Sequence, residues 1–353
     1  MLTSAGWGVE AIDAPEVWAQ GYTGQGAVVA VIDSGIDAHV DLIPNIWVNS
    51  DETKNNRDDD GNGYVDDLNG WNYVEGYYHP IGANTHGTHV SGTIAALNNG
   101  FGTTGVAYDA KIMPLRVFDD DGNGSTSDMA SAVRYAVDNG ADIINMSIGS
   151  TSTRNLTLAL EYAQQKNVLI VAAAGNGGAN APNFPANLSS ELDNIISVGS
   201  HARSQSLSST SNHVGSSGAV QVDAPGVGIE STVSSNKFDV SSGTSIATAH
   251  VSGIAALALS ANPDIEVAQL RAAIVAGSTS RRALGSDSVG MVNAMKTVEL
   301  VLADVRDSDL RADFNRDGTV GFDDFLVVAR NFGSQNASHA RGCLLYTSDA
   351  ADE

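Results

Sequence analysis

Short apolar runs alternate with segments of helical pattern through most of the 353-residue chain. The runs are rich in β-branched residues, as expected of strands that are buried on both faces of a parallel sheet. They cover residues 27–32, 112–117, 142–148, 168–174 and 195–198. The helical segments between them include residues 129–139 and 156–166. This β-α-β-α order predicts an α/β fold with a mainly parallel central sheet that helices cover on both faces.

Two polar residues follow strands of this predicted sheet. Asp33 comes directly after the first strand, and Asn176 follows the strand at residues 168–174. Ligands of open α/β sheets bind at the carboxyl ends of the strands, so both residues are candidates for a functional site. A side-chain amide such as that of Asn176 can donate a hydrogen bond to an oxyanion. The alternatives are an Asx turn at Asp33 and a left-handed Asn in an Asn-Gly turn at Asn176.

Residues 246–259 carry no formal charge and place apolar side chains on several faces of a helix. A helix that is apolar all round is buried, and Asn262-Pro263 can end it. Ser245 lies at its start, where the positive end of the macrodipole favours an alkoxide or oxyanion. Ser245 is therefore a candidate nucleophile, and its alternative role is an N-cap. The helix is expected to be too short to span a bilayer, so we expect no membrane partner.

A second helix of small residues begins at His86 and continues to Ala96. A neutral histidine is the usual general base near pH 7, so His86 is a candidate for that role. His86 and His89 can also be interpreted as metal ligands, but the stretch lacks the acid of the His-Glu-x-x-His zinc motif. For His89 a hydrogen-bonded core histidine is the more credible interpretation.

Four stretches of the chain carry a family resemblance. They are VIDSGID at 31–37, HGTHVSGTIAA at 86–96, AAAGN at 172–176 and SSGTSIATAHVSG at 241–253. In this order they resemble the signatures of the subtilisin-like serine endopeptidases, or subtilases, and the resemblance extends over roughly residues 7–300. It implies a subtilisin-like three-layer fold over residues 1–303 and the hydrolysis of peptide bonds in proteins or peptides.

The resemblance implies a role for each of the four candidates. Asp33 orients the imidazole of His86, which takes the proton from Ser245 and returns it to the leaving amine. Ser245 attacks the peptide carbonyl, and the Asn176 side chain and the Ser245 backbone N–H hold the oxyanion. The alternative is a catalytically inactive binding protein or scaffold with the subtilisin fold, against which the intact set of four residues argues.

The resemblance also implies where the substrate binds. An extended peptide lies between residues 122–126 and 147–149, and its specificity side chain enters a pocket walled by 147–149 and 173–175. The residues assigned to this groove are Gly122, Gly124, Ser147, Ile148, Gly149, Ala173, Ala174 and Gly175. These walls are small and mostly uncharged, which favours a broad or apolar preference.

Calcium is the expected cofactor. In the family a loop after the histidine helix holds a structural calcium ion through alternate carbonyl groups, with one supporting carboxylate. The matching residues are Asp41, Leu97, Asn99, Phe101 and Thr103. Cys343 is the one cysteine, so the chain has no intrachain disulfide and a bound ion would help to keep it folded.

Two further stretches have the spacing of calcium loops, in which oxygen ligands on alternate residues surround one cation. In the acidic stretch 51–70 these ligands are Asp58, Asp60, Asn62, the Tyr64 carbonyl and Asp66. A merely solvated acidic loop is the alternative there. Near the C-terminus the ligands are Asp313, Asn315, Asp317, the Thr319 carbonyl and Asp324.

The C-terminal stretch resembles one calcium-binding repeat of a dockerin, which is a small EF-hand-like unit. We place this repeat at residues 304–334, and the resemblance makes a cohesin-like protein a candidate partner. Residues 335–353 match nothing before them and are expected to be disordered or artefactual.

Charge restricts the partners further. The chain has 18 Lys and Arg residues against 41 Asp and Glu residues, a formal net charge of −23 that disfavours nucleic acid as a partner. The N-terminal residues have neither a basic region nor a long apolar region, so no signal peptide is visible. The family resemblance nevertheless implies a secreted protein, and we expect a monomer.

Overall fold

The computed structural model describes residues 6–82, 84–279 and 288–311. The chain divides into two compact units, Met1–Glu299 and Leu300–Glu353, and helix α8 (Ala294–Arg311) begins in the first and ends in the second. The predicted C-terminal repeat and tail fall in the second unit, of which residues 312–353 lie outside the described residues.

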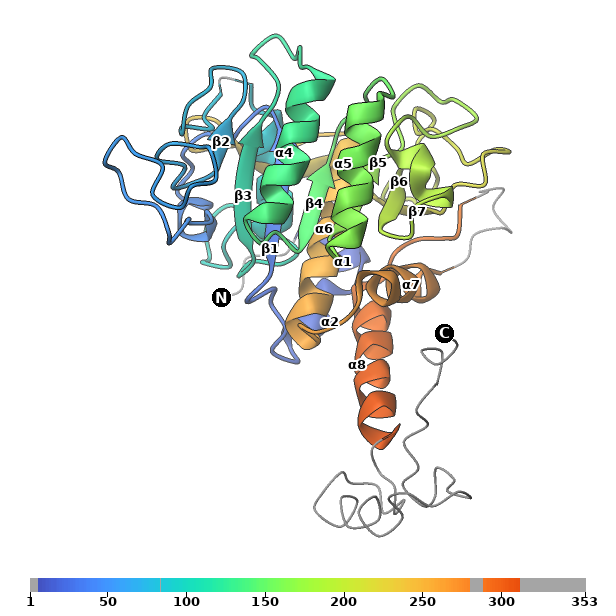
Figure 1. The fold of residues 1–353 in the computed structure, drawn as a ribbon. Coiled ribbons are helices and arrows are strands. Elements are labelled where there is room, and N and C mark those ends of the chain that lie inside the picture. Colours follow the sequence, from blue (N-terminus) through green and yellow to red (C-terminus); the bar gives the residue numbers. More distant parts are fainter. Residues whose placement is uncertain (1–5, 83, 280–287, 312–353) are drawn as a thin grey trace, which may run out of the picture. The chain divides into compact units, whose positions relative to one another are not determined.

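Seven parallel strands form the central sheet of the first unit, in the order β2-β3-β1-β4-β5-β6-β7 (Figure 1). They are β1 (Val28–Asp33), β2 (Trp71–Asn72), β3 (Lys111–Arg116), β4 (Ile143–Met146), β5 (Leu169–Ala173), β6 (Ile195–His201) and β7 (Gln221–Pro225). β1 is an interior strand, in which Val29 pairs with Ile112 of β3 and with Ile143 of β4. The predicted α/β fold with a mainly parallel sheet is therefore confirmed, although the sequence pattern does not predict β2 and β7.

Helices cover both faces of this sheet (Figure 1). Those that precede α8 are α1 (Trp7–Ala11), α2 (Ala14–Trp18), α3 (His86–Ala95), α4 (Thr126–Asp138), α5 (Arg154–Gln165), α6 (Thr244–Ala261) and α7 (Val267–Gly277). α4 and α5 pack on one face, in a core cluster that includes the strand residues Ile32, Ile144 and Ile170. α6 packs on the other face and contacts α3. Because successive side chains of a strand point to opposite faces, a continuous apolar run fills both layers of the core.

α6 is the helix that the sequence predicts to be buried, and every residue from Ile246 to Leu259 is buried. The helix is longer than the uncharged run, and by length and composition alone its 18 residues could cross a membrane. The expectation that it is too short to do so is therefore wrong. However, 78% of this stretch is buried inside the protein, as is typical of the core helix of a soluble fold.

Local interactions explain where two elements depart from the prediction. α4 starts at Thr126, before the predicted start, because the Ser125 hydroxyl caps the helix by accepting a hydrogen bond from the Asp128 N–H (3.0 Å). β8 (Ile229–Val233) and β9 (Lys237–Ser241) form an antiparallel hairpin that the sequence pattern does not predict. Neither strand has the continuous apolar run that marks the strands of the central sheet.

Candidate active site

Residues that are far apart in the sequence meet at the carboxyl edge of the sheet. Asp33 is the last residue of β1, and Asn176 follows the end of β5. His86 is the first residue of α3, and Ser245 lies in the first turn of α6. α3 and α6 contact each other and the sheet, so the core holds the starts of both helices.

His86 is bonded to the buried carboxylate of Asp33. Its Nδ1 lies 2.8 Å from Asp33 Oδ1 and 3.0 Å from Asp33 Oδ2. The Asp33 side chain is 1% exposed and the His86 side chain is 37% exposed. The imidazole therefore contacts the protein through Asp33 and remains accessible to solvent elsewhere. An ionised carboxylate only accepts hydrogen bonds, which places the imidazole proton on Nδ1 and leaves a lone pair on Nε2. The negative charge of Asp33 raises the pKa of His86 above its ordinary value; burial opposes this rise and the hydrogen bond adds to it.

The close approach of α3 to the end of β1 requires Gly87. A Cβ atom at this position would lie 2.2 Å from the Gly35 carbonyl oxygen and 3.2 Å from Asp33 Oδ1. Because packed atoms do not approach as closely as 2.2 Å, any larger residue would push His86 away from Asp33.

Ser147, just beyond β4, holds the Ser245 hydroxyl. Ser245 Oγ donates to the Ser147 carbonyl oxygen at 2.9 Å, and Ser147 Oγ donates to the Ser245 carbonyl oxygen at 2.7 Å. The N-cap of α6 is Gly243, without a side-chain cap, so the alternative of Ser245 as the N-cap is wrong. Among the described residues no hydrogen bond joins Ser245 to His86, and in enzymes without substrate such bonds are often long.

Thr244 fixes the orientation of the Asn176 side chain, although no motif in the sequence marks it for this role. Asn176 Oδ1 accepts hydrogen bonds from the N–H (2.9 Å) and the hydroxyl (3.2 Å) of Thr244. A backbone N–H can only donate, so Oδ1 must face Thr244 and the Nδ2 group is directed away from it. Gly175, and not Asn176, has the positive φ (+108°), so the alternative of a left-handed Asn is wrong.

A groove of about 280 Å³ opens beside His86. It is lined by Asp33, Ser34, Asn84, His86, Phe118, Gly122, Ile148 and Gly149. Gly122, Ile148 and Gly149 are among the residues predicted to bind substrate, whereas Phe118 and Asn84 are not. Gly124 pairs with Phe118 instead of lining the groove.

Asn183 lies between the two predicted walls of the specificity pocket. A Cβ atom at Gly149 would lie 3.2 Å from Asn183 Nδ2, and one at Gly175 would lie 2.5 Å from it. Ala173 and Ala174 are buried beside Gly175 in the sequence. A side chain at Gly175 would collide with Asn183, and one at Gly149 would require Asn183 to shift slightly, so small residues suit both walls.

Asp41 and the loop after α3 form a candidate calcium site. Asp41 is fully buried, and its Oδ1 accepts a hydrogen bond from Asn99 Nδ2 (2.6 Å), whereas Oδ2 has no partner among the described residues. Burial raises the pKa of Asp41, although the Asn99 bond and the nearby His39 oppose this. The Leu97 N–H donates to the Asp41 carbonyl oxygen, and the Phe101 N–H donates to Asn99 Oδ1. A buried carboxylate oxygen without a donor fits a bound cation.

The acidic loop before β2 groups its carboxylates differently from the prediction. One oxygen from each of Glu52, Asp58 and Asp60 lies within 4.8 Å of the other two. The Asp66 carboxylate instead accepts the backbone N–H groups of residues 55–56. Glu52, and not Asp66, therefore completes this group of three carboxylates.

The remaining predicted calcium ligands are not all described. In the acidic loop Asn62 Oδ1 accepts a hydrogen bond from the Tyr64 N–H (2.8 Å), which tightens the turn between them. The predicted C-terminal ligands lie outside the described residues: Asp313, Asn315, Asp317, Thr319 and Asp324.

His89 and His250 are buried in the core. His89 is buried, its Nε2 lies 3.1 Å from the Ile229 carbonyl oxygen, and burial lowers its pKa. The prediction of a core histidine is therefore confirmed, and the pairing of His86 with Asp33 removes the support for a shared zinc site. His250 is also buried, which lowers its pKa to about 4, so it is neutral at pH 7.

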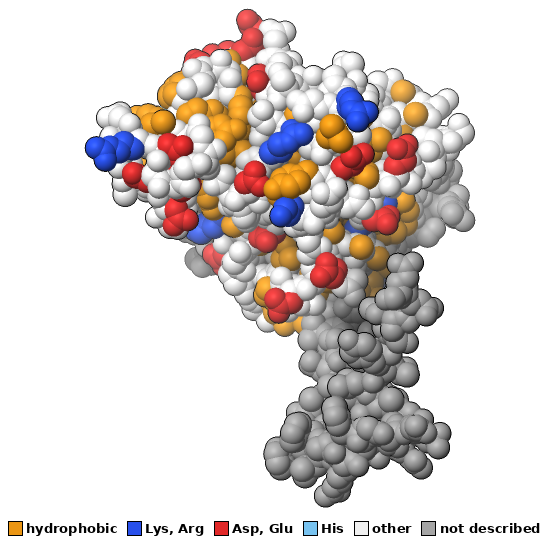
Figure 2. Space-filling view, in the orientation of Figure 1, with side chains coloured by type: hydrophobic (Ala, Val, Ile, Leu, Met, Phe, Trp, Pro, Cys, Tyr) orange, Lys and Arg blue, Asp and Glu red, His pale blue; other side chains and the backbone are white. Residues whose placement is uncertain are grey.

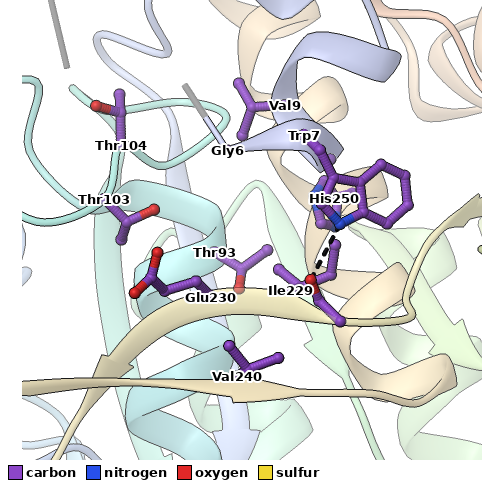
Figure 3. Close-up of a pocket in the computed structure, with 12 residues that line it drawn as sticks. Gly6, Trp7, Val9, Thr93, Thr103, Thr104, Ile229, Glu230, Val240 and His250 are labelled. Atoms are coloured by element: carbon purple, nitrogen blue, oxygen red, sulfur yellow. Dashed lines mark hydrogen bonds between the residues drawn. The ribbon is translucent and has the colours of Figure 1, made fainter. Parts of the chain in front are cut away.

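His250 lines a second cavity, of about 230 Å³ (Figure 3). Trp7, Thr93, Thr103, Glu230 and Val240 also surround it, and a dashed line marks the bond from Trp7 Nε1 to the Gly228 carbonyl (3.0 Å). None of the lining residues reproduces the pairing of His86 with Asp33, so we place the chemistry in the groove beside His86 and not in this cavity.

Comparison with known proteins identifies the family. The sequence matches the Subtilase family over residues 24–294, which is more than half of the chain. Subtilisin BL and Subtilisin Savinase of Lederbergia lenta are each 35% identical over 292 residues, covering 82% of this chain and 97% of theirs. The Thermostable alkaline protease of Halalkalibacterium halodurans is 36% identical over 297 residues, covering 83% of this chain and 73% of its own. Such similarity defines a serine endopeptidase. The chain belongs to the subtilase family.

Proposed function

We propose that this protein hydrolyses peptide bonds with Asp33, His86 and Ser245 as its catalytic triad. The observation that carries the proposal is the pairing of His86 Nδ1 with both oxygens of the buried Asp33 carboxylate. With Nδ1 held in this way, Nε2 accepts the proton of Ser245 Oγ as that oxygen attacks the peptide carbonyl. Nε2 then donates the proton to the leaving amine, and the Asp33 charge stabilises the imidazolium formed between these two steps.

We assign the oxyanion donors to Asn176 Nδ2 and the backbone N–H of Ser245. Thr244 occupies Asn176 Oδ1, which leaves the amide nitrogen as the donor. The Ser245 N–H is one of the first N–H groups of α6, which have no acceptor within the helix. Donors that are oriented before the reaction stabilise the charge that develops on the carbonyl oxygen in the transition state.

Asn176→Ala is expected to lower kcat about 10²–10³-fold with little change in KM, which is the range known for the corresponding subtilisin donor. The reason is that the lost hydrogen bond forms mainly in the transition state. Steady-state kinetics on a chromogenic peptide measure both constants. Asn155→Ala, at an exposed position of α5, is the matched control and should retain both. A loss confined to KM would contradict the assignment.

Labelling with a fluorophosphonate tests the proposed function directly. We expect one label per chain, located on Ser245 by peptide mapping, together with cleavage of casein. The Ser245→Ala variant should take up no label. If intact, calcium-loaded protein neither reacts with the fluorophosphonate nor cleaves casein, the proposed peptidase activity is wrong. The protein is then better described as an inactive scaffold with the subtilisin fold.

We expect the substrates to be proteins or peptides with apolar side chains near the cleaved bond. Phe118 and Ile148 supply apolar surface to the groove beside His86, which Ser34 and Asn84 also line.

We assign a structural calcium ion to Asp41 and the loop after α3, since the buried Asp41 Oδ2 has no donor among the described residues. Asn99 and the carbonyl groups of Leu97, Phe101 and Thr103 complete the proposed set of ligands. A bound ion would supply the positive charge that the buried carboxylate lacks and would fasten this loop to the segment around Asp41.

Asp41→Asn is expected to remove the part of the calcium-dependent stabilisation that the ion at Asp41 supplies. An ion present at 100 times its dissociation constant stabilises the folded state by about 2.7 kcal/mol, and this contribution should disappear. Thermal unfolding with calcium and with a chelator measures the difference. Asp264→Asn, an exposed substitution with the same charge change, should leave the difference intact. An undiminished calcium effect in Asp41→Asn would argue against this ligand.

We further propose, from the sequence spacing, that residues 313–324 bind calcium as a dockerin-like repeat. The repeat would occupy residues 304–334, beside a peptidase domain at 1–303, with a cohesin-like protein as candidate partner. An extracellular location follows from the family resemblance.

A further inference from the structure

We propose that the acidic loop before β2 binds a divalent cation of the calcium type through Glu52, Asp58 and Asp60. One oxygen from each of these three residues lies within 4.8 Å of the other two, which is close enough for all three to contact one ion. The site does not depend on the peptidase chemistry. It also differs from the set given by the sequence spacing, since Glu52 is a ligand and Asp66 is not.

Glu52 supplies the observation that points to a ligand. Its side chain is 3% exposed, and Oε1 accepts hydrogen bonds from the N–H groups of Asp59 (2.6 Å) and Asp60 (3.2 Å). Its Oε2 is also buried and has no hydrogen-bond partner among the described residues. A buried carboxylate oxygen without a donor is unfavourable, and a cation between the three carboxylates removes that penalty.

Within the part of the chain that the structure describes, no basic side chain forms an ion pair with these three carboxylates. The stretch 51–70 contains seven Asp and Glu residues against Lys54 and Arg57. Lys54 Nζ lies over the Tyr78 ring, 5.1 Å from its centroid, and the ion pairs of the described residues include neither Glu52 nor its two neighbours in the cluster. In Figure 2 acidic and basic side chains stand at the left surface, where this loop lies in Figure 1. Carboxylate oxygens are hard ligands, so calcium is the expected ion.

Hydrogen bonds connect the proposed site to the core. Asn49 Nδ2 donates both to Asp60 Oδ2 (3.0 Å) and to Asp67 Oδ1 (3.1 Å). The hydroxyl of Tyr135, which lies on α4, donates to the other oxygen of the buried Asp67. An ion at Asp60 would therefore stabilise this chain of bonds and hold the acidic loop against α4.

The test measures calcium binding and stability in the full chain carrying Ser245→Ala, which prevents self-cleavage. Glu52→Gln keeps an oxygen that can accept from Asp59 and Asp60, but it lacks the negative charge. By isothermal titration with calcium alone, we expect it to bind one ion fewer per chain. We also expect the sign of its stability change to depend on calcium. With a chelator it should unfold at a higher temperature than its parent, because the unpaired buried charge is gone. With excess calcium it should unfold at a lower temperature.

Asp51→Asn is the matched control, since it makes the same change in charge at an exposed neighbour that is outside the cluster. It should keep the full number of ions and show no reversal of sign. Unchanged ion binding in Glu52→Gln, or a stability shift of one sign in both conditions, would overturn the proposal. Since neither measurement uses peptide hydrolysis, this result is independent of whether Ser245 reacts with a fluorophosphonate.

Discussion

Ser245→Ala is expected to lower kcat for peptide hydrolysis about 10⁶-fold, the size of the loss known when subtilisin loses its nucleophile. Without Oγ no acyl intermediate can form, and His86 has no proton to accept. The remaining rate should come from substrate binding and the oxyanion donors, which act on direct attack by water. Single-turnover measurements on a peptide substrate, with protein free of host proteases, give the required sensitivity.

The fold of this variant should remain intact, because alanine is well suited to the first turn of α6. Circular dichroism and calcium-dependent unfolding check this point. Ser260→Ala, near the other end of the same helix, removes a hydroxyl that donates to the Leu257 carbonyl and should leave kcat unchanged. A Ser245→Ala variant that kept more than about one hundredth of the activity would place the nucleophile elsewhere.

Asp33→Asn is expected to lower kcat about 10⁴-fold, the next largest effect. Its side-chain amide can donate to His86 Nδ1, which would place the imidazole proton on Nε2. In that tautomer Nε2 cannot accept the proton of Ser245. Measurement of kcat across a range of pH tests this effect, and a loss smaller than tenfold would contradict the role of Asp33.

The pH profile should shift in a defined direction. His86 must be neutral to act as a base, so activity is lost as the pH falls through its pKa, which the Asp33 charge raises. In Asp33→Asn that charge is absent, so the pKa of His86 falls and the acid limb of kcat/KM moves to lower pH. Asp37→Asn makes the same change in net charge beyond the triad and should leave this limb in place. Coincident acid limbs in Asp33→Asn and the wild-type protein would count against the coupling.

Local pattern and topology together were sufficient to place Asp33 and Asn176. Each follows an apolar run, and in a parallel sheet the carboxyl ends of the strands meet at one edge. The position of Ser245 is as clear, but its local pattern fits an N-cap better than a nucleophile. The combination with Asp33, His86 and Asn176, together with the family resemblance, favours a nucleophile, and in the structure Gly243 is the N-cap.

Long-range contacts explain what the sequence could not predict about the site. Thr244 bonds to Asn176, which is 68 residues away, and nothing in the stretch around Thr244 indicates that partner. In the sequence, Glu52 resembles any solvated acidic residue of a charged loop. Its burial becomes evident only in the folded loop, where it is 3% exposed. Asp66 has the spacing of a ligand, but its backbone is left-handed (φ 57°). Its carboxylate accepts a hydrogen bond from the Asn55 N–H instead of joining the group of three.

Buried polar residues concealed β7 in the same way. Gln221 and Asp223 interrupt the apolar pattern, so the segment does not look like a buried strand. In the fold, Gln221 Nε2 donates to the Asn212 carbonyl oxygen (3.2 Å), and Asp223 accepts from the Ser288 hydroxyl. Once such partners are present, a polar side chain can be buried at little cost, but the partners come from distant parts of the chain.

The place of β1 between β3 and β4 has a consequence for how activity is lost on heating. Backbone amides of an interior strand exchange with solvent chiefly when the whole domain opens, since local fraying does not reach them. Asp33 ends that strand, so the partner of His86 stays in position until the domain unfolds as a unit. The half-life of activity at high temperature should therefore equal the half-life of global unfolding.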